Sequence, residues 1–141
     1  MEKMNFIYDD GGRSRYFKGR EVGDCVCRAV AIASGKDYKE IYQDLKKAVC
    51  VTPRNGVITR SVKFRQWMTK LGFTWVSCSG IGGKQAVHFV LGELPRNKRL
   101  VCSVTKHYVA VVNDEVHDTW DSRYNSWNEL RRIYGYWVYN E

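Results

Sequence analysis

The sequence predicts a single α+β domain over residues 1–141, in which helices come first and an antiparallel sheet follows. Over residues 25–71, apolar side chains recur with helical spacing. After Gly72 the pattern changes to short runs rich in β-branched and aromatic residues, which is typical of strands. No internal repeat or linker divides the chain. This order of elements is that of the α+β class.

The first 22 residues predict an arm or short strand and a loop, and the first helix follows from residue 25. Within that helix only Arg28 carries a charge before Gly35, which is suited to end it. A helix that is apolar on nearly all sides is usually buried. Cys25 stands in its first turn, where unpaired backbone N–H groups and the helix dipole favour a thiolate. We therefore predict a nucleophilic cysteine on a central, buried helix.

Two amphipathic helices follow, and we expect them to pack against the first. One covers residues 38–49, with Asp37 as its cap and Glu40 completing a capping box. The other begins after Thr59, which we predict as its cap, and ends near Leu71. Their apolar residues lie on one face, which indicates a packing role.

The second half of the chain predicts five strands. A glycine-rich loop over residues 79–84 lacks the spacing of a phosphate-binding loop, which argues against nucleotide binding. Residues 88–94 predict a helical turn that ends before Pro95. The strands are expected over residues 73–77, 100–104, 106–112, 115–120 and 134–139.

Two of these strands predict a β-hairpin around residues 113–114. With a two-residue turn, His107 and Asp118 point to the same face of the hairpin as diagonal neighbours. His117 then points to the other face. An imidazole beside a carboxylate is the base and orienter that a nucleophilic thiol requires. Asp121 is the alternative third member of such a triad.

The cysteine pattern favours free thiols. Five cysteines, an odd number at irregular spacing, do not form a disulfide framework. Cys25 and Cys27 are too close for a paired zinc site, and no second pair completes one. We therefore expect no metal and no cofactor. Without a signal peptide's apolar core, or an apolar run long enough to span a bilayer, we expect a cytoplasmic location and no membrane partner.

The chain has 23 Lys and Arg against 15 Asp and Glu, a formal net charge of +8. That balance permits binding to nucleic acid or to an acidic protein. The basic residues are spread along the chain, however, and no helix-turn-helix or RNA-recognition pattern is present. Nucleic acid is therefore the less favoured partner. A non-catalytic module that binds an acidic protein or nucleic acid through a basic, aromatic surface is the alternative to an enzyme.

Three short motifs carry a resemblance: Asp24-Cys25 opening a helix, His107 entering a strand, and Asp118 ending the next. Here the chain resembles the papain-like cysteine peptidases, most closely the small bacterial bacteriocin-processing branch and phage-encoded relatives. The resemblance implies a bacterial or phage protein, acting in the bacterial cytoplasm on a peptide, isopeptide or amide bond of a protein or peptide. Peptidase, deamidase and transglutaminase-like activities all fit. Cys25 would be nucleophile, His107 general base and acid, and Asp118 orienter.

One position departs from the pattern of that family. Papain-like peptidases commonly have a glutamine six residues before the nucleophile, and its amide helps to bind the oxyanion. Here that position is Gly19. Two alternatives follow: another donor takes this role, such as the Cys25 backbone N–H with Asp24 or Arg20 nearby on the oxyanion or substrate side, or the oxyanion hole is incomplete. Loss of one oxyanion donor typically lowers the rate by about 10²–10³-fold.

Overall fold

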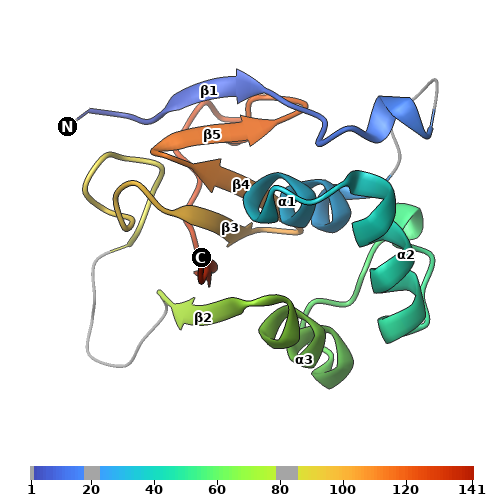
Figure 1. The fold of residues 1–141 in the computed structure, drawn as a ribbon. Coiled ribbons are helices and arrows are strands. Elements are labelled where there is room, and N and C mark those ends of the chain that lie inside the picture. The colour runs from blue at the N-terminus through green and yellow to red at the C-terminus, as the bar shows by residue number, and fades with distance from the viewer. Residues whose placement is uncertain (1, 18–22, 79–85) are drawn as a thin grey trace.

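The computed structural model describes residues 2–17, 23–78 and 86–141, so the glycine-rich stretch 79–84 lies outside it. Three helices cover one face of a six-stranded sheet with the order β1-β5-β4-β3-β6-β2 (Figure 1). The predicted α+β class is thus confirmed. The helices are α1 (Cys25–Ser34), α2 (Tyr38–Val49) and α3 (Val62–Leu71). The strands are β1 (Asn5–Tyr8), β2 (Phe73–Ser77), β3 (Arg99–Val104), β4 (His107–Val112), β5 (Glu115–Asp118) and β6 (Gly135–Tyr139).

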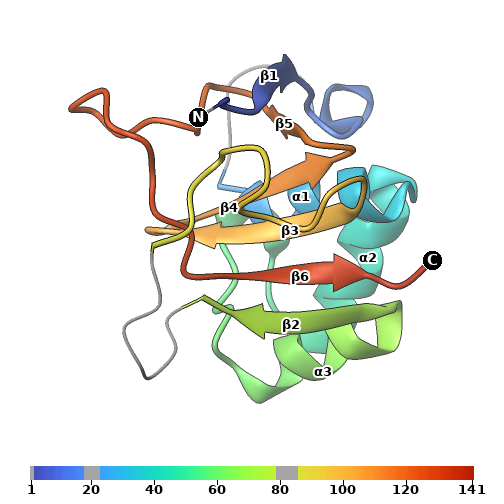
Figure 2. The same ribbon diagram turned by 90° about the vertical axis from the view of Figure 1, so that its left-hand side faces the viewer.

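The sheet is mixed, which corrects the prediction of an antiparallel sheet. β1 pairs in parallel with β5, with Asn5 opposite Glu115 and Tyr8 opposite Asp118, while the other strand pairs are antiparallel. β1 and β2 lie at opposite edges of the sheet (Figure 2). A parallel pair needs a long connection, and here all three helices lie between β1 and β5 along the chain. The local pattern at the N-terminus carries no information about so distant a partner.

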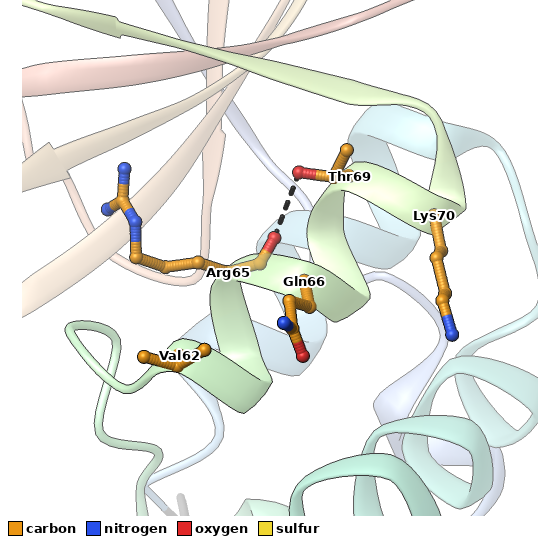
Figure 3. A pocket seen from close by; sticks show the side chains of 5 residues that line it. All are labelled: Val62, Arg65, Gln66, Thr69 and Lys70. Carbon is orange, nitrogen blue, oxygen red and sulfur yellow. Dashed lines mark hydrogen bonds between the residues drawn. The ribbon is translucent and has the colours of Figure 1, made fainter.

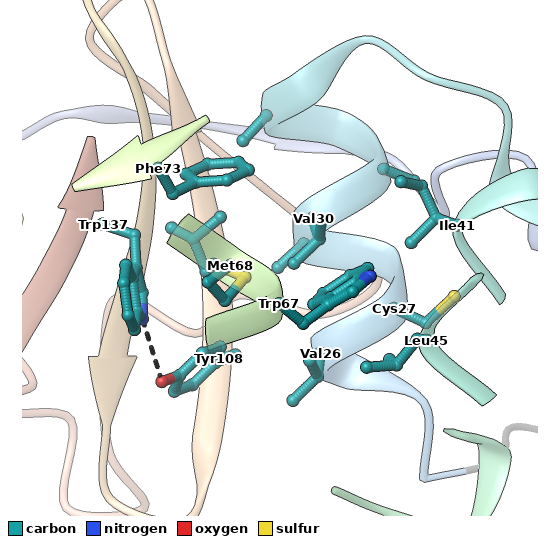
Figure 4. Close-up of a cluster of buried hydrophobic side chains, with 14 of the residues drawn as sticks. Val26, Cys27, Val30, Ile41, Leu45, Trp67, Met68, Phe73, Tyr108 and Trp137 are labelled. Carbon is teal, nitrogen blue, oxygen red and sulfur yellow. Dashed lines mark hydrogen bonds between the residues drawn. The ribbon is translucent and has the colours of Figure 1, made fainter. Parts of the chain in front are cut away.

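The helix α1 crosses the middle of the sheet and is buried on nearly every side, as its composition predicts. It packs on β4 and also contacts β3 and β5. Gly35 ends it with a left-handed φ of 72°. In the core between helices and sheet, Val30 and Met68 are fully buried, and the Trp137 indole donates a hydrogen bond to the Tyr108 hydroxyl at 3.2 Å (Figure 4). Among the described residues, no helix has the length and apolar character that crossing a membrane requires.

The caps agree with the sequence at α2 and differ by two residues at α3. Asp37 caps α2 by accepting a backbone N–H of its first turn at 3.3 Å. The cap of α3 is Ser61, whose hydroxyl accepts a backbone N–H at 3.2 Å, and not Thr59. Thr59 instead forms a hydrogen bond with the phenol of Tyr108. Two hydroxyl residues two positions apart have similar local capping ability, so the distant contact decides between them.

The segment 88–94 forms a turn held by isolated bridges, and not the predicted helical turn. Val90 pairs with Lys3, and the neighbouring Val87 pairs with Ile133. Backbone groups that a helical turn would satisfy locally are therefore paired with distant parts of the chain.

The hairpin of β4 and β5 has the predicted register. Val112 lies opposite Glu115, and Ala110 lies opposite His117. The turn residues 113–114 have φ values of 50° and 68°. Two consecutive left-handed residues are the geometry of a type I′ turn, which matches the twist of the flanking strands.

Candidate active site

Cys25 is the first residue of α1, and the helix N-terminus around it is open. Asp24 precedes the helix, but its side chain accepts no capping hydrogen bond. The first intrahelical bond runs from the Arg28 N–H to the Asp24 carbonyl at 3.0 Å. The N–H groups of residues 25–27 therefore have no acceptor within the helix. These donors and the helix dipole place a positive potential at the thiol.

His107, the first residue of β4, joins this thiol to a carboxylate. Its Nε2 lies 2.6 Å from Oδ2 of Asp118, and its ring also forms a hydrogen bond with the Cys25 side chain. The backbone N–H of Tyr108 donates a further hydrogen bond to the sulfur. The predicted nucleophile, base and orienter come from α1, β4 and β5, and the structure brings them together: the His107 ring contacts both Cys25 and Asp118.

These contacts shift the pKa of each group toward its charged form. Burial raises the pKa of Cys25, but the hydrogen bond and charge of His107, a backbone N–H and the charge of Arg28 outweigh burial and lower it. Burial lowers the pKa of His107, whereas its contacts with Asp118 and Cys25 raise it to about 9. Burial acts to raise the pKa of Asp118, but the hydrogen bond and charge of His107 outweigh burial, so the pKa is lowered. Both shifts favour the charged forms, a thiolate at Cys25 and an imidazolium at His107, relative to the free side chains.

The structure distinguishes the two candidate orienters. Asp118 is buried against His107. Asp121 instead pairs with Arg123 at 2.8 Å and is partly exposed. His117 lies on the opposite face of the hairpin, as the register predicts, and contacts a carboxylate of the N-terminal segment at 3.0 Å. The imidazole of His107 thus has Asp118 as its carboxylate partner.

A buried network of charges continues from Asp118 into the helix layer, and the sequence pattern did not predict it. Arg28 donates to Oδ1 of Asp118 at 3.3 Å and to Oδ1 of Asp24 at 2.6 Å. Arg13 donates to the same Asp24 oxygen at 3.2 Å, and the Tyr38 hydroxyl donates to Oδ2 at 2.6 Å. The two arginines and two carboxylates balance in charge. Arg28 was the available signal, because a cation on an otherwise apolar, buried helix requires a buried anion.

The structure corrects the role expected for Asp24 on the oxyanion or substrate side. Its side chain has no solvent exposure, and both carboxylate oxygens accept hydrogen bonds inside the network. A carboxylate also offers negative charge where an oxyanion needs a donor. Asp24 therefore serves the interior of the fold. Arg20 and Gly19 lie outside the described residues. Among the described residues, the backbone N–H groups left open beside Cys25 are those at the start of α1.

Trp120 covers the imidazole. The rings of His107 and Trp120 have centroids 4.9 Å apart and planes inclined at 39°. An apolar ring in this position keeps water from the bond between His107 and Asp118, and a drier hydrogen bond is electrostatically stronger. The sequence predicts this contact: extending the hairpin register beyond β5, which ends at Asp118, places Trp120 opposite His107.

Cys25 and His107 open onto a cleft of about 710 Å³. Its walls come mainly from residues 55–60, before α3, and from residues 103–106, at the turn between β3 and β4. This volume is typical of ligand sites. A second hollow of about 550 Å³ lies on the outer side of α3 and contains none of the site residues (Figure 3). It is lined by Val62, Arg65, Gln66, Thr69 and Lys70.

Cys27 faces away from this cleft, as helical geometry predicts. It is fully buried, with its sulfur 3.9 Å from the carbonyl oxygen of Tyr38, and burial raises its pKa to about 12. Such a thiol packs and does not react. Within the described ranges, no three His, Cys, Asp or Glu side chains gather as a metal-ligand set.

Comparisons with models of known protein families, with curated proteins and with solved structures give no match to this chain. The chemistry of the site is therefore inferred from its own residues. Those residues are a stabilised thiolate, an imidazole with a buried carboxylate behind it, and open backbone donors beside a cleft.

Proposed function

We propose that the protein is a cysteine-dependent hydrolase or acyl transferase of papain-like arrangement, acting on a peptide, isopeptide or amide bond. One observation carries the proposal: the His107 imidazole contacts both the Cys25 side chain and the Asp118 carboxylate, with 2.6 Å between Nε2 and Oδ2 of Asp118. A thiol, a base within hydrogen-bond reach and a third group that orients the base form the arrangement of a covalent catalyst. The lowered pKa of Cys25 and the raised pKa of His107 support the same roles.

In the first half of the reaction, the Cys25 thiolate attacks the carbonyl carbon of the substrate, which forms a C–S bond and a tetrahedral oxyanion. The open N–H groups at the start of α1 donate to that oxyanion. The His107 imidazolium then gives a ring proton to the leaving nitrogen, the C–N bond breaks, and a thioester remains on Cys25. Asp118 holds the ring in place and stabilises its positive charge.

In the second half, His107 takes a proton from a water molecule whose oxygen attacks the thioester carbon. The C–S bond breaks, the carboxylic acid leaves, and the thiolate–imidazolium pair is restored. With an amine in place of water, the acyl group is transferred to that amine. The acceptor therefore decides between peptidase or deamidase activity and a transglutaminase-like reaction.

Labelling of the intact protein with iodoacetamide tests the activated thiol. Each cysteine is quantified by mass spectrometry from about pH 5 to about pH 9, because an ordinary thiol with a pKa of about 8.5 is almost wholly protonated at the acid end. We expect Cys25 to react at about pH 6. Cys50, which is exposed, provides an internal reference, and the buried Cys27 is expected to remain unlabelled.

Two variants of the hairpin make the test specific. His107→Ala should remove the reactivity of Cys25 at low pH. His117→Ala, which removes a histidine from the other face of the same hairpin, should retain it. If Cys25 follows the pH curve of Cys50, or if His107→Ala keeps the low-pH reactivity, the proposed mechanism is wrong.

The alternative of a non-catalytic binding module predicts a different set of results. It expects no selective labelling of Cys25 at low pH. It also expects nucleic-acid binding that weakens steeply between about 50 and about 200 mM salt, as phosphate contacts do. The same preparations serve for both measurements.

A further inference from the structure

The cleft beside Cys25 is lined by positive charge. Its described lining includes the cationic side chains of Arg60 and Lys106, and it includes no Asp or Glu. Both side chains belong to exposed residues. Neither pairs with a carboxylate within the described parts of the chain, where the ion pairs involve other arginines and histidines. Their charges are therefore available to a ligand.

The two cations come from separate walls of the cleft, and each lies close to the reacting groups. Lys106 directly precedes His107 in the turn between β3 and β4. Arg60 directly follows Thr59, whose hydroxyl contacts the Tyr108 phenol. A ligand that reaches Cys25 must pass between these walls. It therefore enters a region of positive electrostatic potential, which the low dielectric constant of the surrounding protein strengthens.

The remaining lining suits an extended peptide better than a nucleic acid. Asn55, Thr59 and Ser103 offer side-chain donors and acceptors of the kind that bind backbone amides. Tyr134 is the exposed aromatic residue in the described lining, whereas single-stranded nucleic acid typically stacks on several such rings.

We propose that the substrate of this site is an acidic peptide segment, with an aspartate or glutamate close to the bond that Cys25 attacks. The proposal rests on the proposed function of Cys25 and adds the class of substrate. The substrate carboxylate lies between Arg60 and Lys106, which draw it into the cleft and bring the reacting carbonyl to the thiolate. Arg60 and Lys106 are thus specificity residues, not members of the triad.

Two alkylating reagents of nearly equal size measure this field at the sulfur itself. Iodoacetate carries a carboxylate and iodoacetamide is neutral, so the ratio of their rates at Cys25 reports the local charge and cancels differences in thiolate reactivity. In Arg60→Gln/Lys106→Gln we expect the ratio to fall by about three- to tenfold at low ionic strength, with a much smaller change in about 1 M salt.

The matched control is Lys46→Gln/Lys47→Gln on α2, which removes the same charge from an exposed surface outside the cleft. This control should keep the wild-type ratio. If both double variants lower the ratio equally, the effect comes from net charge and the assignment to Arg60 and Lys106 is overturned.

A synthetic peptide mixture then tests the substrate class directly. Mass spectrometry of the products should show Asp or Glu enriched within a few residues of the processed bond, and Arg60→Gln/Lys106→Gln should lose that enrichment. Products without acidic enrichment overturn the acidic-peptide proposal and leave the proposed function standing. If Cys25 shows no selective labelling by iodoacetamide at low pH, both the proposed function and the acidic-peptide proposal are wrong. If a single-stranded oligonucleotide protects Cys25 from iodoacetamide at about 150 mM salt, the cleft binds nucleic acid and the proposal of a peptide substrate is overturned.

Discussion

Replacing Arg28 with methionine tests the buried charge network behind the triad. The guanidinium lies 2.6 Å from Asp24 and 3.3 Å from Asp118, and the side chain is 6% exposed. Methionine is flexible and similar in length to the apolar stem of arginine, so the substitution removes mainly the charge and its hydrogen bonds. Asp24 and Asp118 then remain buried with one partner fewer each.

We expect the free energy of unfolding to fall by about 3 kcal/mol. Removing one partner of a buried ion pair typically costs about 3–5 kcal/mol, because the other charge loses its compensation. The lower end applies because Arg13 still contacts Asp24 at 3.2 Å, and His107 still contacts Asp118 at 2.6 Å. A domain of this size has a total stability of about 5–15 kcal/mol, so the variant should remain folded.

Urea unfolding followed by tryptophan fluorescence measures the change, with an unchanged slope showing that the two-state assumption holds. Arg96→Met is the matched control. Arg96 also lies 3.2 Å from a carboxylate, that of Asp114, but its side chain is 55% exposed. A surface pair contributes about 0–1 kcal/mol, so this variant should lose little stability.

A double variant tests whether the contact itself is responsible. Arg28→Met and Asp24→Asn remove the same hydrogen bond, so their combined effect should be smaller than the sum of the two by at least about 1 kcal/mol. Additive effects, or a loss in Arg28→Met no larger than that in Arg96→Met, would refute the reasoning.

Three further changes have clear expectations. Because the pKa of His107 is raised to about 9, its stabilising contribution is complete below about pH 6.5 and is lost as the pH rises through about 9. The free energy of unfolding of His107→Gln, measured with urea, should therefore lie further below that of the wild type at about pH 6 than at about pH 10. The difference between the two pH values should be up to about 3 kcal/mol. In Gly135→Ala the new Cβ overlaps the Trp75 ring, so a thermal melt should show a loss of about 1–3 kcal/mol that Trp75→Leu in the same chain reduces. Ser61→Ala should lower stability by about 1 kcal/mol through loss of the α3 cap, whereas Thr59→Ala should leave the helical circular dichroism unchanged.

The three members of the candidate triad could be predicted because each is placed by its neighbours along the chain. Cys25 lies at a helix start that its own segment specifies. The two-residue turn at 113–114 sets the register of the hairpin and thereby puts His107 and Asp118 on one face. The alternative third member, Asp121, pairs with Arg123 two residues away. Helix and strand periodicity does not predict this contact, because it lies in an irregular segment.

The remaining features join residues that are far apart in sequence. Arg28 and Asp118 are separated by 90 positions, and β1 finds its parallel partner only after three helices have been placed. The ends of α1 and α2, strand alternation and hairpin register could be read from the chain because they depend on contacts within a few residues. Which carboxylates Arg28 meets, which hydroxyl caps α3, and which cations face the thiol follow from packing, because burial and charge pairing act between surfaces that exist only once the sheet and helices have come together.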